Sequence, residues 1–197
     1  MRIAGRTDRD IARRMLMTAG VPATDIDART EDVRAVACAA YERLCPDDLS
    51  ACVTPGIGEL LDELAAREDT ILSLVTGNFE PIARRKLAAA GIGGYFAAGQ
   101  GGFACDHESR AELPAVARRR AGALLDAGGA GQPWPRERTL LIGDTPRDIA
   151  CARADGVRVV AITTGPYDAD DLADADAVAR DAGELGRLLA GLMAPAP

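Results

Sequence analysis

The apolar positions of the first fifty residues recur at helical spacing, and no alternating or continuous apolar run among them predicts a strand. Thr7 is the candidate N-cap of a first helix, which ends before Gly20. A second helix is predicted from about residue 25 to residue 44, because Pro46 stops the pattern. The chain therefore opens with a helical unit, which we expect to cover residues 1–54.

The pattern changes at Thr54, where short apolar runs begin to alternate with helical segments. Strands are predicted at residues 70–75, 95–98, 139–143 and 157–162. Strands that alternate with helices of about ten to fifteen residues indicate a parallel sheet covered on both faces. We therefore expect an α/β core over residues 55–197.

Composition and charge narrow the classes of partner. The 197 residues carry 30 Asp and Glu against 23 Lys and Arg, a net charge of −7, which disfavours nucleic acid and anionic membrane surfaces as partners. No apolar run approaches the roughly 18 to 20 residues of a membrane span, and the first residues lack the apolar region of a signal peptide. We expect a cytoplasmic protein whose five cysteines are reduced thiols.

Two carboxylates stand at the end of one predicted strand. Asp144 follows the strand at residues 139–143, and Asp148 comes four residues later in the first turn of a predicted helix. Both side chains can face one divalent cation, and Mg²⁺ suits one or two carboxylates with waters. Asp148 has an alternative role, because an acid three residues after the candidate N-cap Thr145 can reach back and cap the helix. Asp144 is harder to explain without a cation or hydrogen-bond donors, because burying its charge is costly.

A second strand end carries groups that suit a phosphoryl oxygen. Thr76, Gly77 and Asn78 follow the predicted strand at residues 70–75 and offer a hydroxyl and free backbone N–H groups. Taken alone, a threonine at a strand end is ordinary. In parallel sheets, however, the chemistry collects where the carboxyl ends of the strands meet, so we expect these residues to lie near Asp144.

Together these motifs resemble the haloacid dehalogenase superfamily of hydrolases, in the subgroup that is similar to phosphoglycolate phosphatase. The resemblance rests on residues 143–149 (G-D-T-P-R-D-I), on the strand ending in Thr-Gly-Asn at Asn78, and on residues 5–8, which are similar to the start of the family's helical cap. It implies a Rossmann-like parallel sheet with a small helical cap. It also implies a Mg²⁺-dependent phosphatase of a small phosphorylated metabolite, with the metal held by Asp144 and Asp148.

The resemblance also implies a basic side chain that holds the phosphoryl group. Arg110 stands after the second predicted strand, where relatives have a lysine, and Lys86 is the alternative although it lies well inside a predicted helix. We favour Arg110, acting with Thr76 as a catalytic group while Gly77 and Asn78 bind substrate. His107 is interpreted as an exposed loop residue, with substrate contact as the alternative.

The family's nucleophile, the first Asp of Asp-x-Asp-Gly-Thr on the first core strand, has no counterpart in this sequence. The Asp8-Arg9-Asp10 segment is interpreted instead as the acidic first turn of a helix. We therefore expect the chain as given to be catalytically silent, and the gene product to start upstream with the missing strand. The alternatives are a non-catalytic binding protein and a 2-haloacid dehalogenase. The Asp144 and Asp148 pair argues against the latter, because carbon–halogen displacement needs no cation.

Overall fold

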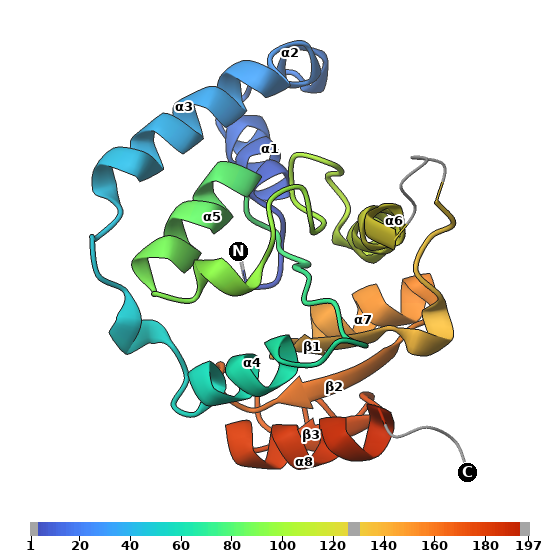
Figure 1. Cartoon of the computed structure of the whole chain (residues 1–197). Coiled ribbons are helices and arrows are strands. Elements are labelled where there is room, and N and C mark those ends of the chain that lie inside the picture. The colour runs from blue at the N-terminus through green and yellow to red at the C-terminus, as the bar shows by residue number, and fades with distance from the viewer. Residues whose placement is uncertain (1–3, 126–130, 194–197) are drawn as a thin grey trace.

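The computed structural model describes residues 4–125 and 131–193, which form a three-stranded parallel sheet with helices around it (Figure 1). The α-helices are α1 (Asp8–Thr18), α2 (Ala23–Ala28), α3 (Thr30–Leu44), α4 (Ile57–Ala65), α5 (Glu80–Ala89), α6 (Leu113–Leu125), α7 (Pro146–Asp155) and α8 (Ala182–Met193). The short 3₁₀ helices are η1 (Ser50–Cys52), η2 (Gly93–Tyr95), η3 (Arg110–Glu112) and η4 (Arg136–Arg138). The strands are β1 (Leu140–Gly143), β2 (Arg158–Ile162) and β3 (Ala177–Ala179).

Within the first fifty residues, the described part consists of helices joined by turns and short irregular segments and contains no strand, as the sequence predicts. Thr7 is the N-cap of α1, and its hydroxyl accepts a hydrogen bond from the backbone N–H of Asp10 at 3.1 Å. The single helix predicted over residues 25–44 is wrong, because the chain turns at Arg29 and separates α2 from α3. Helix α3 runs beside α5, which joins this part of the chain to the rest (Figure 1). The boundary at residue 54 stays a prediction.

The sheet has strand order β1-β2-β3, with all neighbours parallel. Alternate side chains of β1 and β2 face opposite sides, so each face packs on a different group of helices. On one face, Leu141 and Val159 pack with Ile149 of α7. On the other, Val160 packs with Leu60 of α4 and Leu185 of α8. The prediction of an α/β fold with a parallel sheet covered on both faces is confirmed (Figure 1).

The predicted strands at residues 139–143 and 157–162 correspond to β1 and β2. The strand predicted at residues 70–75 is wrong, because only Val75 forms a bridge, in parallel with Gly102. Two backbone hydrogen bonds make that bridge, and within residues 4–125 and 131–193 nothing extends it into a ladder. Val75, at the end of this segment, nevertheless packs against the core cluster that contains Leu141 and Val159 of the sheet, so Thr76 follows directly after a residue beside the sheet.

The strand predicted at residues 95–98 is also wrong. Helix η2 occupies the start of this segment. The guanidinium of Arg84 donates hydrogen bonds to the carbonyl groups of Phe96 and Ala97 at 2.7 and 3.0 Å, and in a strand these carbonyl groups would accept from a neighbouring strand instead. Strand β3 was not predicted, because three residues are too few to display a periodic pattern.

A buried ion pair closes the packing of α6 on α7. The guanidinium of Arg118 donates to both carboxylate oxygens of Asp155 at 2.6 and 2.8 Å, and the two side chains are only 9% and 3% exposed. Its remaining nitrogen donates to the carbonyl of Trp134 at 2.7 Å. The pair therefore joins two helices and the segment before β1.

We expect Arg118→Ala to lower the free energy of unfolding by about 3 kcal/mol, because it leaves the Asp155 carboxylate buried without its main partner. Urea denaturation followed by circular dichroism measures the change. Arg67→Ala is the matched control, since its ion pair with Asp69 is exposed on both sides (41% and 60%) and should change the free energy of unfolding far less. Equal losses in the two variants would contradict this account.

Candidate active site

Three of the residues predicted for the site lie together at the end of β1 and the start of α7. Arg110 opens η3, Asp144 follows β1, and Asp148 lies in the first turn of α7. The guanidinium of Arg110 donates to Asp148 Oδ1 at 2.5 Å and to the carbonyl of Val75 at 3.4 Å. Because Thr76 follows Val75 directly, all four predicted residues belong to one region. Arg110 is the side chain that connects its parts.

Asp148 has the capping role that the sequence offered as an alternative. Its Oδ2 accepts hydrogen bonds from the backbone N–H of Thr145 at 3.1 Å and from the Thr145 hydroxyl at 2.8 Å, and the Thr145 hydroxyl in turn caps α7. The carboxylate is almost fully buried, and its other oxygen, Oδ1, accepts the hydrogen bond from the Arg110 guanidinium. A metal at Asp148 would bind Oδ1, which accepts only the Arg110 contact and keeps a second lone pair, because Oδ2 already accepts two hydrogen bonds.

Asp144 is the other carboxylate of the site, and unlike Asp148 it forms no ion pair within the described residues. Burial raises the pKa of its carboxyl group above the ordinary value, and the negative charge of Asp148 raises it further. A hydrogen bond from the backbone N–H of Asp144 itself and the charge of the Arg110 guanidinium partly offset both effects. In the part of the chain that the structure describes, no other residue donates a hydrogen bond to this side chain. Gly165 keeps the space beside it open, because a Cβ atom there would collide with Asp144 Oδ2. The site thus holds two carboxylates and one arginine.

This donor set fits Mg²⁺, which binds one or two carboxylates and takes its other ligands from waters or substrate phosphates. A cation would offset the excess negative charge at Asp144. The described residues contain no group of three or more His, Cys, Asp or Glu side chains that could hold a metal ion, so a site closed by protein ligands alone is not formed here.

Arg110 has a nitrogen without a partner. Its Nε is buried and, within the described residues, makes no hydrogen bond, while a terminal nitrogen carries the contacts to Asp148 and Val75. A buried N–H without an acceptor is costly, and an anionic oxygen would satisfy it. This is the feature expected of an arginine that holds a phosphoryl group.

Lys86 lies in a different cluster. Its ammonium group donates to Asn78 Oδ1 at 3.0 Å and lies 5.2 Å from the centre of the Tyr41 ring. The Asn78 amide in turn donates to both carboxylate oxygens of Asp8, at 3.1 and 3.3 Å. The two candidate basic residues therefore bind different side chains, and of the two only Arg110 contacts a predicted metal ligand.

The loop at residues 76–78 is covered by the chain's own first residues. The backbone N–H of Asp8 donates to the carbonyl of Gly77 at 2.6 Å, and a Cβ atom at Gly77 would collide with the carbonyl of Arg6. The N–H groups of Thr76 and Asn78 are bonded to the Gly102 carbonyl and to the Thr76 hydroxyl. The expectation that these N–H groups are free is therefore wrong for Thr76 and Asn78.

Sequence reasoning missed two residues that shape this region. Asp8 accepts the backbone N–H of Phe79 at 2.8 Å and so holds the start of α5. Glu108 contacts α1 through Arg13 at 2.8 Å. The segment at residues 5–8 was noticed only as similar to the start of a cap, and long-range pairs such as these leave no local pattern. His107 Nδ1 accepts the N–H of Ser109 at 2.9 Å, which gives this histidine a local role in the loop.

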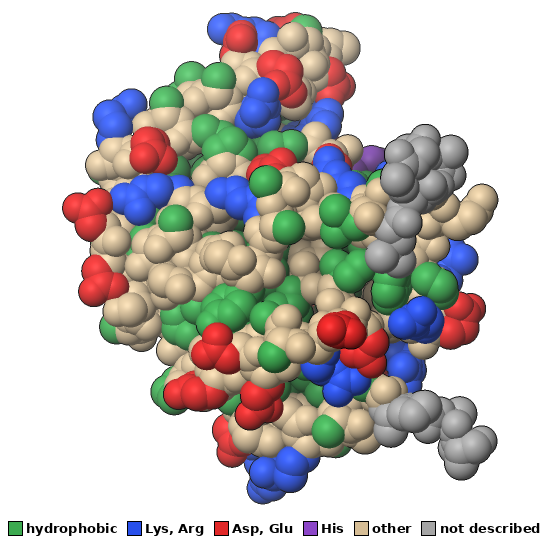
Figure 2. All heavy atoms as spheres, viewed as in Figure 1, with side chains coloured by type: hydrophobic (Ala, Val, Ile, Leu, Met, Phe, Trp, Pro, Cys, Tyr) green, Lys and Arg blue, Asp and Glu red, His purple; other side chains and the backbone are tan. Residues whose placement is uncertain are grey.

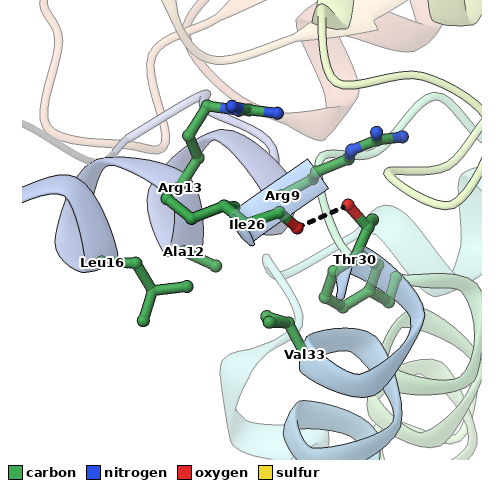
Figure 3. A pocket seen from close by; sticks show the side chains of 8 residues that line it. Arg9, Ala12, Arg13, Leu16, Ile26, Thr30 and Val33 are labelled. Atoms are coloured by element: carbon green, nitrogen blue, oxygen red, sulfur yellow. Dashed lines mark hydrogen bonds between the residues drawn. The ribbon is translucent and has the colours of Figure 1, made fainter. Parts of the chain in front are cut away.

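A small pocket lies elsewhere, between α1, α2 and α3 (Figure 3). Leu16, Ala12 and Val33 form its apolar side, and the guanidinium groups of Arg9 and Arg13 lie along the opposite side. None of the predicted catalytic or metal-binding residues lines it. The candidate site is therefore the junction around Arg110 and not this pocket.

Figure 2 shows Lys and Arg side chains intermixed with Asp and Glu on the face that is drawn. In residues 4–125 and 131–193, no helix combines the length and apolar character needed to cross a bilayer.

Comparisons with known proteins place these features in context. A family model described as haloacid dehalogenase-like hydrolase matches residues 2–153. Among solved structures, the chain is similar to one described as a beta-phosphoglucomutase from Bacteroides vulgatus, with a TM-score of 0.61 and 21% identity over 95% of this chain and 70% of that chain. At this identity the likeness shows the fold alone. A search of curated proteins finds no match.

We expect Asp144→Asn to raise the urea midpoint at pH 7 in the absence of divalent cations. Because folding raises the pKa of Asp144, ionising this carboxyl at neutral pH costs the folded state free energy that the neutral amide does not lose. The gain should shrink as the pH falls, and vanish below the ordinary pKa of 3.8, where the carboxyl is protonated in both states.

Glu63→Gln is the control, since it removes one negative charge at an exposed position on α4. Its midpoint should follow that of the unmodified protein across the same pH range. A lower midpoint for Asp144→Asn at every pH would mean that the carboxylate is satisfied in the folded state, contrary to the geometry described above.

Proposed function

The chain belongs to the haloacid dehalogenase-like hydrolases, and from this membership we propose that it forms the metal-binding and phosphate-holding part of a Mg²⁺-dependent phosphatase site. The substrate would be a small phosphorylated metabolite. The observation that carries the proposal is the contact of Arg110 with Asp148 beside Asp144, with the Arg110 Nε left without an acceptor. This arrangement leaves one cationic donor and two carboxylates for a phosphate and its metal. A cytoplasmic location remains our prediction.

Asp144 and Asp148 would hold Mg²⁺, which supplies neutralisation of phosphoryl charge when bound. Arg110 would bind a phosphoryl oxygen through its Nε, and Thr76 would offer its hydroxyl from the position directly after the Val75 bridge. Gly77 and Asn78 would bind substrate only if the first residues of the chain moved away from them. Donors aimed at equatorial oxygens supply most of the catalysis in phosphoryl transfer.

The nucleophile would be an aspartate on a strand alongside β1. In the described residues β1 pairs only with β2, and Ile142 is 43% exposed although its strand belongs to the core. No Asp-x-Asp-Gly-Thr motif occurs among the 197 residues, so we propose that they do not turn over phosphate esters by themselves.

A non-catalytic phosphate-binding protein is the second candidate. The hydrogen bonds that occupy Asn78 and the carbonyl of Gly77 favour it, because the loop is engaged with the chain's own Asp8. A 2-haloacid dehalogenase is disfavoured, since carbon–halogen displacement gives the Asp144 and Asp148 pair no function.

Hydrolysis of a generic phosphate ester with Mg²⁺ separates the two candidates. We expect no turnover by the 197 residues, and turnover by a chain extended upstream with an apolar strand that ends in Asp-x-Asp-Gly-Thr. The extended chain carrying Asp144→Asn controls for contaminating phosphatases. It should lose the Mg²⁺-dependent turnover, whereas the activity of a contaminant would persist. Equal turnover by the short and extended chains would refute the missing nucleophile.

Binding of inorganic phosphate distinguishes Arg110 from Lys86. In the presence of Mg²⁺, we expect Arg110→Ala to weaken binding by more than about tenfold, because a charge-assisted hydrogen bond is lost. Lys86→Ala should change the affinity by less than about twofold, since its ammonium group contacts Asn78 and Tyr41 instead. Isothermal titration calorimetry measures both. The reverse order of effects would transfer the phosphate-holding role to Lys86.

A further inference from the structure

The residues before Arg110 cross from the packed core to helix α1 (Figure 1). On the core side, Arg120 of α6 donates to both carboxylate oxygens of Asp106 at 2.8 and 2.7 Å, and to the carbonyl of Gly101 at 2.6 Å. This holds the first half of the loop. The second half, residues 107–109, is held from a different element.

Glu108 is the residue that α1 holds. The Thr7 hydroxyl donates to the Glu108 carbonyl at 2.6 Å, and Thr7 is 1% exposed. The Glu108 carboxylate forms an ion pair with the Nε of Arg13 at 2.8 Å, and the Nε of Arg9 lies 3.5 Å from the same carboxylate. Arg13 also pairs with Asp27, so α2 joins the same cluster. Both the backbone and the side chain of Glu108 are therefore tied to the N-terminal helices.

Arg110 lies only two residues further along. Its carbonyl accepts a hydrogen bond from the Cys151 thiol of α7 at 3.1 Å, and its side chain reaches Asp148. The segment from Glu108 to Arg110 therefore spans the short distance between α1 and α7 with a fixed point at each end. A change at one end is transmitted to the other, because one intervening residue has little freedom to absorb it.

Building on the proposed function, we propose that Glu108 is a positioning residue, which ties the Arg110 loop to α1 and so presents the Arg110 guanidinium to the phosphoryl group only while α1 is docked. Release of Glu108 leaves Arg110 held by Asp148 and Cys151 of α7 and by the weaker contact with the Val75 carbonyl. The guanidinium then loses its fixed direction, and binding phosphate must repay the cost of ordering it. A purely structural ion pair would change stability without changing phosphate affinity.

The first test is amide hydrogen exchange with Glu108→Gln, which removes the charge and keeps the size of the side chain. We expect exchange in residues 106–112 to accelerate by about fivefold, because the loop opens locally more often. Glu112→Gln is the matched control, since Glu112 is exposed at the end of η3 in the same segment of the chain. Unchanged exchange in Glu108→Gln would overturn the proposal whatever the chain binds.

The second test is titration with inorganic phosphate and Mg²⁺. Glu108→Gln should weaken binding about fivefold in the unmodified chain and have no further effect on Arg110→Ala, because it acts through Arg110. Arg13→Gln should give the same loss as Glu108→Gln, and the double variant no more than either.

The outcomes separate this inference from the proposed function. If Arg110→Ala weakens phosphate binding and Glu108→Gln does not, the positioning role of Glu108 is wrong and the proposed function stands. If Glu108→Gln weakens binding equally with and without Arg110, Glu108 acts by some other route and the inference fails. If the unmodified chain binds no phosphate with Mg²⁺, both are overturned.

Discussion

The ion pair between Arg110 and Asp148 is the contact on which the arrangement of the site depends. The side chains are 17% and 5% exposed, so the 2.5 Å contact lies where water screens it little. Asp148 also caps α7 through Thr145, and Arg110 also reaches the carbonyl of Val75. One pair of side chains therefore sets the start of a helix, the end of an extended segment and the direction of the loop before η3. Removing either partner would leave a buried charge, which is why these elements behave as one unit.

A second set of contacts joins the helical first part of the chain to the same region. Asp8 holds the amide of Asn78 and the N–H of Phe79, so the start of α1 and the start of α5 share one carboxylate. Thr7 caps α1 and anchors Glu108 with the same hydroxyl. Residues 76–78 and 107–109 are thereby both fastened to α1. Movement of α1 would change the two loops together, which couples the helical part to the site through hydrogen bonds.

Charge balance explains why the site points to a cation and an anion together. Asp144 and Asp148 face one arginine, and burial already disfavours ionisation of Asp144. A cation alone would neutralise the carboxylates, whereas the buried Nε of Arg110 lacks an acceptor that only an anionic or polar ligand supplies. The two deficits are complementary. Under the proposed function, a phosphate with Mg²⁺ would satisfy both, and the described residues supply no acceptor for the Arg110 Nε and no group of three metal-binding side chains.

Local pattern predicted β1, β2 and the helical start of the chain, because periodicity, capping residues and strand ends are properties of neighbouring residues, but it missed the break at Arg29 between α2 and α3. It failed at residues 95–98, whose carbonyl groups are taken by Arg84, and at residues 70–75, where a strand needs partners that the pattern does not contain. The separation of Lys86 from Arg110, and the attachment of Glu108 to α1, were decided only by the tertiary structure. Those contacts join residues far apart in the chain, and their geometry exists only once the helices have packed.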